Sequence, residues 1–294
     1  MSAKYLIINA DDYGFYACTS KGILQGAEHG AITATGFMAN SPGFEEYAQW
    51  LKPVTELDTG VHLNISYGTP LSIELADYLS PWQGEFPGKL SMVRAILSGK
   101  LPVPMIEKEW RLQIERCLRQ QIDIKFLNSH EHLHMLPPLY KIFCQLVNEF
   151  QLFNSRKTLS EWHTPLTFGA LFRNSALSAI NVFNSQQSMP QSPKLLGLNA
   201  SGHLTIAYLN KIFGSLKSGQ VYELMCHPGY FDRDEITDPD LLRYHRWEVE
   251  LNLLLSDEFG QLCVQHGIEL INYRQLDELN RKKHNLLSGL EHTK

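Results

Sequence analysis

Two adjacent acids close to the N-terminus are the first residues with an evident capacity for chemistry. Asp11 and Asp12 follow an apolar run at residues 5–9 and precede Tyr13 and Gly14. A lone Asp at the end of a strand often only caps the next helix. Two neighbouring carboxylates repel each other, however, and a cation beside them relieves that repulsion. The pair therefore predicts a site that binds a cation or moves a proton.

A cluster of histidines marks a second position. His130, His132 and His134 directly follow an apolar run at residues 124–128 that predicts a strand. If this backbone is extended, the three imidazoles share one side and Glu131 points away from them. Three imidazoles at the end of a strand indicate that at least one binds a metal ion or takes part in catalysis.

The same cluster matches H-E-x-x-H, the zinc-protease signature, through His130, Glu131 and His134. That signature needs a helix, which stacks the two histidines on one face. Here a strand precedes the cluster, and Pro137 and Pro138 suit the start of a helix rather than its interior. A zincin-like metalloprotease is therefore the alternative function, and Glu131 is the residue that distinguishes the two.

Two further histidines, His62 and His227, end predicted strands. For each, the common alternative is a buried histidine that only bonds to a backbone carbonyl. Cys226 beside His227 suggests a thiol nucleophile, but neighbours in a strand face opposite sides and cannot form a nucleophile–base pair. We expect His227 to give or take a proton at the same site as the acids.

The elements that position these residues follow from hydrophobic patterning. Short apolar runs alternate with longer amphipathic runs, the pattern of βα units in a largely parallel sheet or barrel. Predicted strands cover residues 5–9, 32–39, 59–63, 124–128, 221–226 and 268–272, and predicted helices cover 19–29, 44–51, 106–121, 139–150, 204–216, 241–266 and 273–279. We expect loops at 71–101 and 153–195. Parallel strands in such folds end at one edge, where the acids and histidines should meet.

The bulk composition narrows the class of function. The 294 residues carry a net charge of −5 and no dense block of Lys or Arg, which argues against nucleic-acid binding. Five scattered cysteines favour reduced thiols and a cytoplasmic location. The apolar start is too short for a signal peptide or a membrane span. We expect a single domain over residues 1–280, a polar C-terminal tail at 281–294 that frays, and, by base rate, a homodimer.

Four motifs together resemble the YdjC-like carbohydrate deacetylases of the chito-oligosaccharide deacetylase type. They are NADDYG, GVHLN with a downstream Gly-Thr-Pro-Leu, NSHEHLHMLP and ELMCHPG, and they run in order over about residues 5–230. The resemblance implies a distorted (β/α) barrel similar to polysaccharide deacetylases, a divalent metal ion and hydrolysis of the acetamide of an N-acetylated sugar. It leaves open a chitobiose-like oligosaccharide, a monomeric N-acetylhexosamine derivative or a lipid-linked glycan as the substrate.

The resemblance also implies roles for individual residues. Asp12, His62 and His130 match the metal ligands, and Asp11 matches the general base. His227 would then protonate the departing sugar amine. The family implies Mg²⁺, although one carboxylate and two imidazoles suit Zn²⁺ better.

The chain departs from the family at Asn128, where an Asp is usual. Asn128 can still accept a hydrogen bond but adds no negative charge, so we expect altered metal affinity or activity. A sugar-binding or regulatory protein on an inactive barrel is a third interpretation. The presence of both acids and of all expected ligands disfavours it.

Aromatic and polar residues near these motifs are the predicted contacts to the sugar. Aromatic rings can stack on apolar sugar faces, and polar side chains can bond to sugar hydroxyls. The predicted substrate-binding residues are Tyr13, Asn64, His132, His134, Arg156 and Tyr230, and further candidates are Trp82, Phe86 and Arg173.

Overall fold

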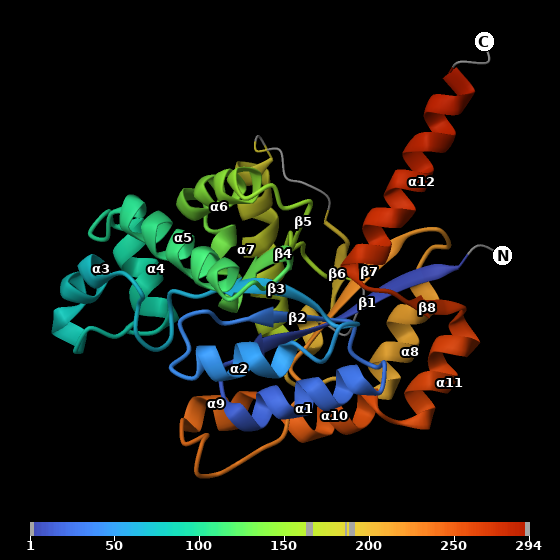
Figure 1. Cartoon of the computed structure of the whole chain (residues 1–294), viewed down its shortest axis with the longest axis horizontal. Helices are drawn as coiled ribbons and strands as arrows, with labels where there is room; N and C mark the ends of the chain where they lie inside the picture. The colour runs from blue at the N-terminus through green and yellow to red at the C-terminus, as the bar shows by residue number, and fades with distance from the viewer. Residues whose placement is uncertain (1–2, 163–166, 186, 188–191, 292–294) are drawn as a thin grey trace.

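The centre of the molecule is a curled parallel sheet (Figure 1), in a computed structural model that describes residues 3–162, 167–185, 187 and 192–291. The strands pair in the order β5-β4-β3-β2-β1-β7-β6, and β8 pairs with the start of β1. All pairings among the described strands are parallel. The strands are β1 (Lys4–Tyr13), β2 (Ala34–Phe37), β3 (Asp58–Leu63), β4 (Ile124–Ser129), β5 (Asn154–Ser155), β6 (Lys194–Leu196), β7 (Val221–Cys226) and β8 (Ile268–Leu270). The predicted α/β class, a distorted (β/α) barrel, is confirmed.

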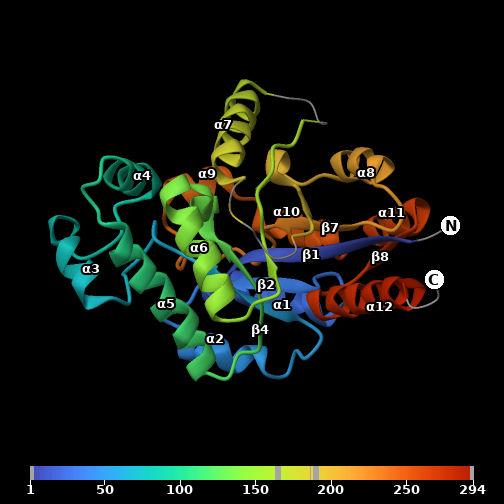
Figure 2. The ribbon, with the colours of Figure 1, turned by 90° about the horizontal axis from the view of Figure 1, so that it is seen from above.

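Helices connect the strands and lie around the outside of the curled sheet (Figures 1 and 2). They are α1 (Ala17–Glu28), α2 (Phe44–Leu51), α3 (Ile73–Tyr78), α4 (Lys89–Leu97), α5 (Val103–Arg119), α6 (Pro137–Glu149), α7 (Phe168–Asn184), α8 (Ile206–Ser215), α9 (Pro239–Tyr244), α10 (Trp247–Leu254), α11 (Asp257–His266) and α12 (Tyr273–Glu291), with short 3₁₀ turns η1 (Ser80–Trp82), η2 (His130–Met135) and η3 (Leu198–Ala200). Leu6, Ile8 and Ala10 of β1 point into the main core, which lies between the sheet and these helices.

Side chains on the other side of β1 point into the barrel. Ile7 lies in a separate apolar cluster, here called the floor, which closes the amino-terminal end of the barrel. Its buried members are Ile7, Ala34, Phe126, Ile271, Tyr273 and Leu276. Phe126 stacks on Tyr273 with ring centroids 4.4 Å apart, so the start of α12 plugs this end. A Cβ at Gly60 would lie 2.5 Å from the Phe126 ring, so a side chain there would displace it.

Four predicted segments differ from the structure. The single helix predicted at 241–266 is three helices, α9, α10 and α11, and Ser256 starts the last by accepting a hydrogen bond from the Phe259 amide. The predicted loop at 71–101 contains α3 and α4, and the predicted loop at 153–195 contains α7. The N-caps Ser72 and Thr167 begin α3 and α7. The tail predicted to fray from 281 instead continues α12 to Glu291.

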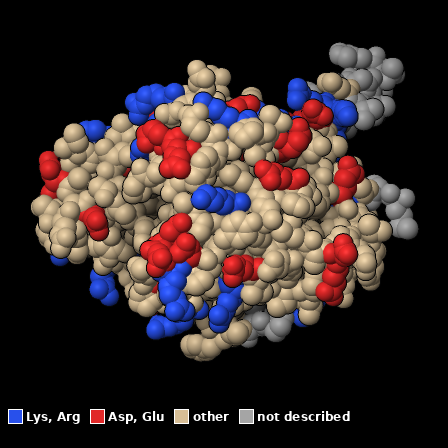
Figure 3. Space-filling model, turned by 60° about the horizontal axis from the view of Figure 1, so that its bottom comes forward, with Lys and Arg blue, Asp and Glu red and all other residues tan. Residues whose placement is uncertain are grey.

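Charged side chains of both signs are spread over the face shown in Figure 3. There Lys and Arg side chains are interspersed with Asp and Glu side chains rather than gathered into one basic patch. Within the described part of the chain, no helix combines the length and the apolar character needed to cross a membrane.

Candidate active site

The two acids at the end of β1 reach the same mouth of the barrel because the backbone turns between them. Asp11 continues the inward row of Ile7 and Asn9. Asp12 adopts a left-handed conformation with φ +68°, where the pairing of β1 with β2 shifts register. This conformation is costly for a residue with a side chain and tends to occur at functional sites. It brings both carboxylates to the carboxyl-terminal edge of the sheet.

Asp12 is the centre of a triad with two histidines. Its Oδ1 lies 2.8 Å from His130 Nδ1 and 3.2 Å from His62 Nε2. One ligand atom from each residue lies within 4.8 Å of the others. Tetrahedral zinc, with bonds of about 2.0–2.2 Å, separates its ligand atoms by about 3.3 Å. The donor set and its spacing therefore fit a divalent metal ion.

The charges of the triad already balance one another. Burial raises the pKa of Asp12, but His130 and His62 outweigh it and hold that pKa well below its usual value. Burial lowers the pKa of His130, but the Asp12 carboxylate raises it overall to about 9. A buried carboxylate compensated by an imidazolium is a place where a metal cation can replace a proton.

His62 is oriented by Asn128, its partner in the register between β3 and β4. The Asn128 amide lies 2.7 Å from His62 Nδ1. In one orientation of the amide, its oxygen accepts the proton of His62 Nδ1, which leaves Nε2 free to bind a cation. In the other orientation, its nitrogen donates to Nδ1 and its oxygen accepts from Arg156 at 3.2–3.3 Å. A metal ion at Nε2 requires the first orientation. Gly36 makes room, because a Cβ there would lie 3.0 Å from the His62 ring.

Asp11 is held by a fully buried arginine. Arg156 donates from Nη1 to Asp11 Oδ2 at 2.5 Å and from Nη2 to Asp11 Oδ1 at 2.8 Å. Its Nε and Nη2 donate to Glu223 Oε1 at 2.8 and 2.5 Å. Burial raises the pKa of Asp11, but Arg156 and His62 outweigh it and lower that pKa overall. Asp11 is thus an ionised carboxylate in fixed orientation. The prediction that Arg156 contacts substrate is wrong, because its side chain is enclosed below the mouth.

The histidine cluster is not extended, contrary to the predicted geometry. Glu131 and His132 have φ of +52° and +56°, so η2 turns each side chain in a different direction. His134 is fully buried, with Nδ1 2.6 Å from Ser129 Oγ and Nε2 3.0 Å from the Arg156 carbonyl oxygen. It cannot contact substrate as predicted. Since His130 and His134 diverge, the arrangement of an H-E-x-x-H protease does not form.

His227 occupies the mouth at the end of β7. Its Nε2 lies 4.0 Å from Asp12 Oδ2, and its backbone amide donates to Glu250 Oε2 at 2.6 Å. Its Nδ1 is buried without a hydrogen-bond partner among the described residues. Cys226 is fully buried and faces the Asn9 carbonyl oxygen, on the opposite side of the strand as expected.

These groups open into one cavity of about 450 Å³. Lys89, Arg173, Tyr244 and His245 line it alongside Asp11, Asp12, His62, His130, His132 and His227. Nothing in the sequence indicated Lys89, Tyr244 or His245, because Lys89 lies in a predicted loop and the other two lie near the beginning of one long predicted helix. His132, predicted to bind substrate, does face this cavity, with Nδ1 3.0 Å from Thr158 Oγ1.

Other predicted substrate contacts lie elsewhere. Tyr13 is fully buried, packs edge-on against Phe37 and donates its hydroxyl to the Tyr47 carbonyl oxygen. Asn64 is also buried, and its side chain shapes the loop after β3 by accepting from the Ser66 and Tyr67 amides. Tyr230 is exposed and donates to Gln25 of α1. Phe86 is buried in the main core, while Trp82 is half exposed outside the cavity.

Comparison with known proteins places the chain in a family. The family model for YdjC-like protein matches residues 5–265. A carbohydrate deacetylase of Geobacillus stearothermophilus is 27% identical over 277 residues, covering 94% of this chain and 99% of that protein. A carbohydrate deacetylase of Homo sapiens is 25% identical, covering 95% and 92% of the two chains.

A solved structure agrees with the fold. The protein, from Enterococcus faecalis V583 and assigned as a cellobiose-phosphate cleavage protein, matches with a TM-score of 0.72 at 23% identity, covering 94% of this chain and 99% of its own. At that identity the likeness shows a shared fold and nothing more. Together, the full-length family match, the full-length relatives and the shared barrel confirm the resemblance seen in the motifs: this chain belongs to the YdjC-like protein family.

Proposed function

We propose that this chain is a metal-dependent carbohydrate deacetylase that hydrolyses the acetamide of an N-acetylated sugar. The observation that carries the proposal is one cavity in which an ionised, rigidly held Asp11 lies beside the Asp12, His62 and His130 triad. The names of the full-length relatives point to the same reaction class.

The side chains of the mouth supply the two proton transfers that amide hydrolysis needs. A divalent ion held by Asp12, His62 and His130 would polarise the acetamide carbonyl and promote ionisation of water. Asp11 accepts the proton of the water that adds to the carbonyl carbon, and Arg156 keeps its carboxylate pointed at the mouth. When the C–N bond breaks, His227 donates a proton to the sugar nitrogen, and acetate and a free amine leave. Each such group typically contributes about 10²–10⁴ in rate.

The identity of the ion is part of the proposal. The resemblance to the family suggests Mg²⁺, which prefers oxygen ligands and retains its waters. The triad offers two imidazole nitrogens and one carboxylate, a set that favours Zn²⁺ or another first-row transition metal. We propose Zn²⁺ on the chemistry of the donors and Mg²⁺ as the alternative.

The proposal extends to the class of substrate and to the location in the cell. We infer an N-acetylated sugar such as a chitobiose-like oligosaccharide, with a lipid-linked glycan as the alternative. The five cysteines are free and buried, which supports a cytoplasmic location where thiols stay reduced.

Acetate release tests the proposal. We expect release from N-acetylglucosamine or its β-linked oligomers, loss of activity in a chelator and recovery on adding Zn²⁺ or Mg²⁺. Asp12→Ala should lose most of its bound metal by elemental analysis. No acetate from any of these sugars with metal-loaded protein would contradict the proposal.

Two variants check the assigned roles. Glu131→Gln is the matched control, because Glu131 lies at the rim, where it pairs with Lys89, and should be dispensable. A large loss of turnover would show that Glu131 takes part in the reaction. His227→Ala should slow an N-acetyl sugar far more than an O-acetyl ester, whose leaving group needs less protonation. Equal losses on both would remove His227 from the mechanism.

A further inference from the structure

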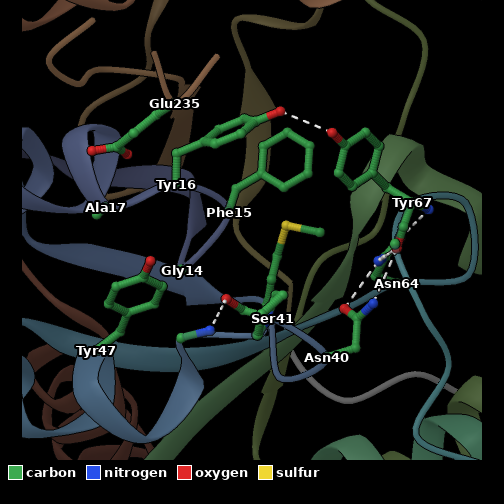
Figure 4. A pocket seen from close by; sticks show the side chains of 14 residues that line it. Gly14, Phe15, Tyr16, Ala17, Asn40, Ser41, Tyr47, Asn64, Tyr67 and Glu235 are labelled. Carbon is green, nitrogen blue, oxygen red and sulfur yellow. Dashed lines mark hydrogen bonds between the residues drawn. The ribbon is translucent and has the colours of Figure 1, made fainter. Parts of the chain in front are cut away.

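A second cavity opens at the same edge of the barrel as the catalytic one. It has a volume of about 490 Å³ and is formed by segments that follow β1, β2, β3 and β7 (Figure 4). In barrels of this kind, the segments after the carboxyl ends of the strands are where ligands bind. The lining residues of the two cavities, as far as the described chain shows them, do not overlap. This cavity therefore offers contacts that the chemical step does not use.

One aromatic wall separates the two cavities. The Phe15 ring lies 5.6 Å from the His130 ring and 4.4 Å from the Tyr67 ring, measured between centroids. The Tyr16 and Tyr67 hydroxyls are 2.8 Å apart and close the wall (Figure 4). A ligand in the second cavity is thus one aromatic ring away from a residue of the metal triad. A chain molecule lying along this edge can reach both places.

Three polar groups in the second cavity retain unused hydrogen-bonding capacity. Glu235 Oε2 accepts from the Cys18 amide at 2.8 Å, and a carboxylate has lone pairs for further hydrogen bonds. The Tyr47 hydroxyl has no hydrogen-bond partner in the described chain, and it lies on the same side of the cavity as Glu235 in Figure 4. Ser41 Oγ accepts from the Gly43 amide, so its own proton is available.

The lining specifies the chemistry of the ligand. Four aromatic rings, from Phe15, Tyr16, Tyr47 and Tyr67, supply flat apolar faces. Glu235 is an acceptor of hydroxyl protons, and no Lys or Arg appears among the lining residues described. A phosphate or carboxylate would therefore meet a like charge and no cation. A neutral sugar ring, with C–H faces for the aromatics and hydroxyls for Glu235 and Tyr47, fits these features.

We propose that this cavity binds a neutral sugar residue of an oligosaccharide whose neighbouring N-acetylated residue occupies the catalytic cavity. The assignment rests on the proposed function in so far as the substrate is a sugar. The glycan would cross the wall at Phe15 and Tyr67 and place its next ring against Tyr47 and Glu235. The cavity would then select oligosaccharides over monosaccharides.

The test compares chain lengths. Acetate release is measured on N-acetylglucosamine and on its β-linked trimer, with wild type, Tyr47→Ala and Glu235→Gln. Glu235→Gln preserves the acceptor for the Cys18 amide but removes the charge. We expect each variant to lower kcat/KM for the trimer by about tenfold or more, as loss of a hydrogen bond to a charged acceptor implies, and to leave the value for the monosaccharide within twofold. Trp82→Ala, an exposed aromatic outside both cavities, is the control and should change neither value.

A binding measurement separates this assignment from the proposed function. Calorimetry of the trimer with otherwise wild-type protein, and with Tyr47→Ala, needs no turnover. Trimer binding that Tyr47→Ala weakens would support the sugar site even if no acetate were ever released. An unchanged trimer-to-monosaccharide ratio in both variants, or unchanged trimer affinity in Tyr47→Ala, would overturn the site and leave the deacetylase proposal standing.

Discussion

The floor and the mouth of the barrel are built from the same strands and have opposite properties. Along the inward side of β1, Ile7 belongs to the apolar floor, Asn9 donates to Glu223, and Asp11 bonds to Arg156. Each step of two residues rises about 6.6 Å. Within roughly 13 Å the interior changes from hydrocarbon to a layer of buried charged groups and then to an open site. The comparison shows a strand that is apolar and buried at one end and that carries the proposed catalytic acids at the other.

The largest expected effect comes from the mouth. Asp11→Asn preserves shape but removes the proton acceptor, so turnover should fall by about 10²–10⁴. Bound metal should change little, because Asp11 lies outside the triad, whereas loss of the buried ion pair with Arg156 should lower the thermal midpoint. Asp58→Asn is the matched control: Asp58 is also a buried acid paired with an arginine, Arg274, but it lies at the start of β3. It should alter stability and spare turnover. Equal losses of turnover in both variants would contradict the distinction between the mouth and the opposite end of the barrel.

The next effect comes from the floor. Phe126→Ala removes a fully buried ring stacked on Tyr273 and should lower the free energy of unfolding by about 3–5 kcal/mol. Turnover per folded molecule should stay within twofold, because the paired charges above the floor are untouched. Urea unfolding and acetate release measure the two quantities. Phe153→Ala, with a side chain 74% exposed, should shift stability by less than about 0.5 kcal/mol. A large loss of turnover in folded Phe126→Ala would show that the two ends are coupled.

A smaller effect is expected from His134, which lies beneath the mouth. Burial and then Arg156 lower its pKa to about 3. Because the folded-state pKa lies below the unfolded value of about 6.5, its contribution is present above about pH 6.5 and is lost as the pH falls towards 3. Between pH 7 and pH 5 the loss is about 2 kcal/mol. The difference in unfolding free energy between these two pH values should shrink in His134→Asn and persist in His203→Gln, whose side chain is exposed. An undiminished difference in His134→Asn would contradict the assignment.

The sequence predicted strands better than the segments between them. The strand at 221–226 and the helix at 44–51 match the structure, because a continuous apolar run and a clear amphipathic period each admit one assignment. Residues 241–266 satisfied a helical period throughout, although the chain breaks near His245 and at Ser256. Hydrophobic periodicity indicates which side of a helix is buried. It does not reveal a break between two helices when the apolar residues keep the same spacing across the break.

The site shows the same limit at the level of side chains. The motifs led to Asp12, His62 and His130, which the structure brings together. Arg156 was expected at the sugar and holds Asp11 instead, since no local pattern reveals a partner far away in the chain. Tyr13 was expected at the mouth, but the left-handed turn at Asp12 sends it into the core. Neither the amino-acid composition nor the hydrophobic periodicity indicates a single positive φ angle such as that of Asp12.

The position of Arg156 has a consequence for how the molecule is assembled. The backbone pairing of the sheet ends at β5 on one side and at β6 on the other. Arg156 directly follows β5 and ties it to Asp11 of β1 and Glu223 of β7, over separations of 145 and 67 residues. Contacts this distant in sequence form late in folding, because the intervening chain must first be ordered. The proposed base is therefore aligned only when the start, middle and end of the chain have met, so a newly made chain acquires activity only as its barrel closes.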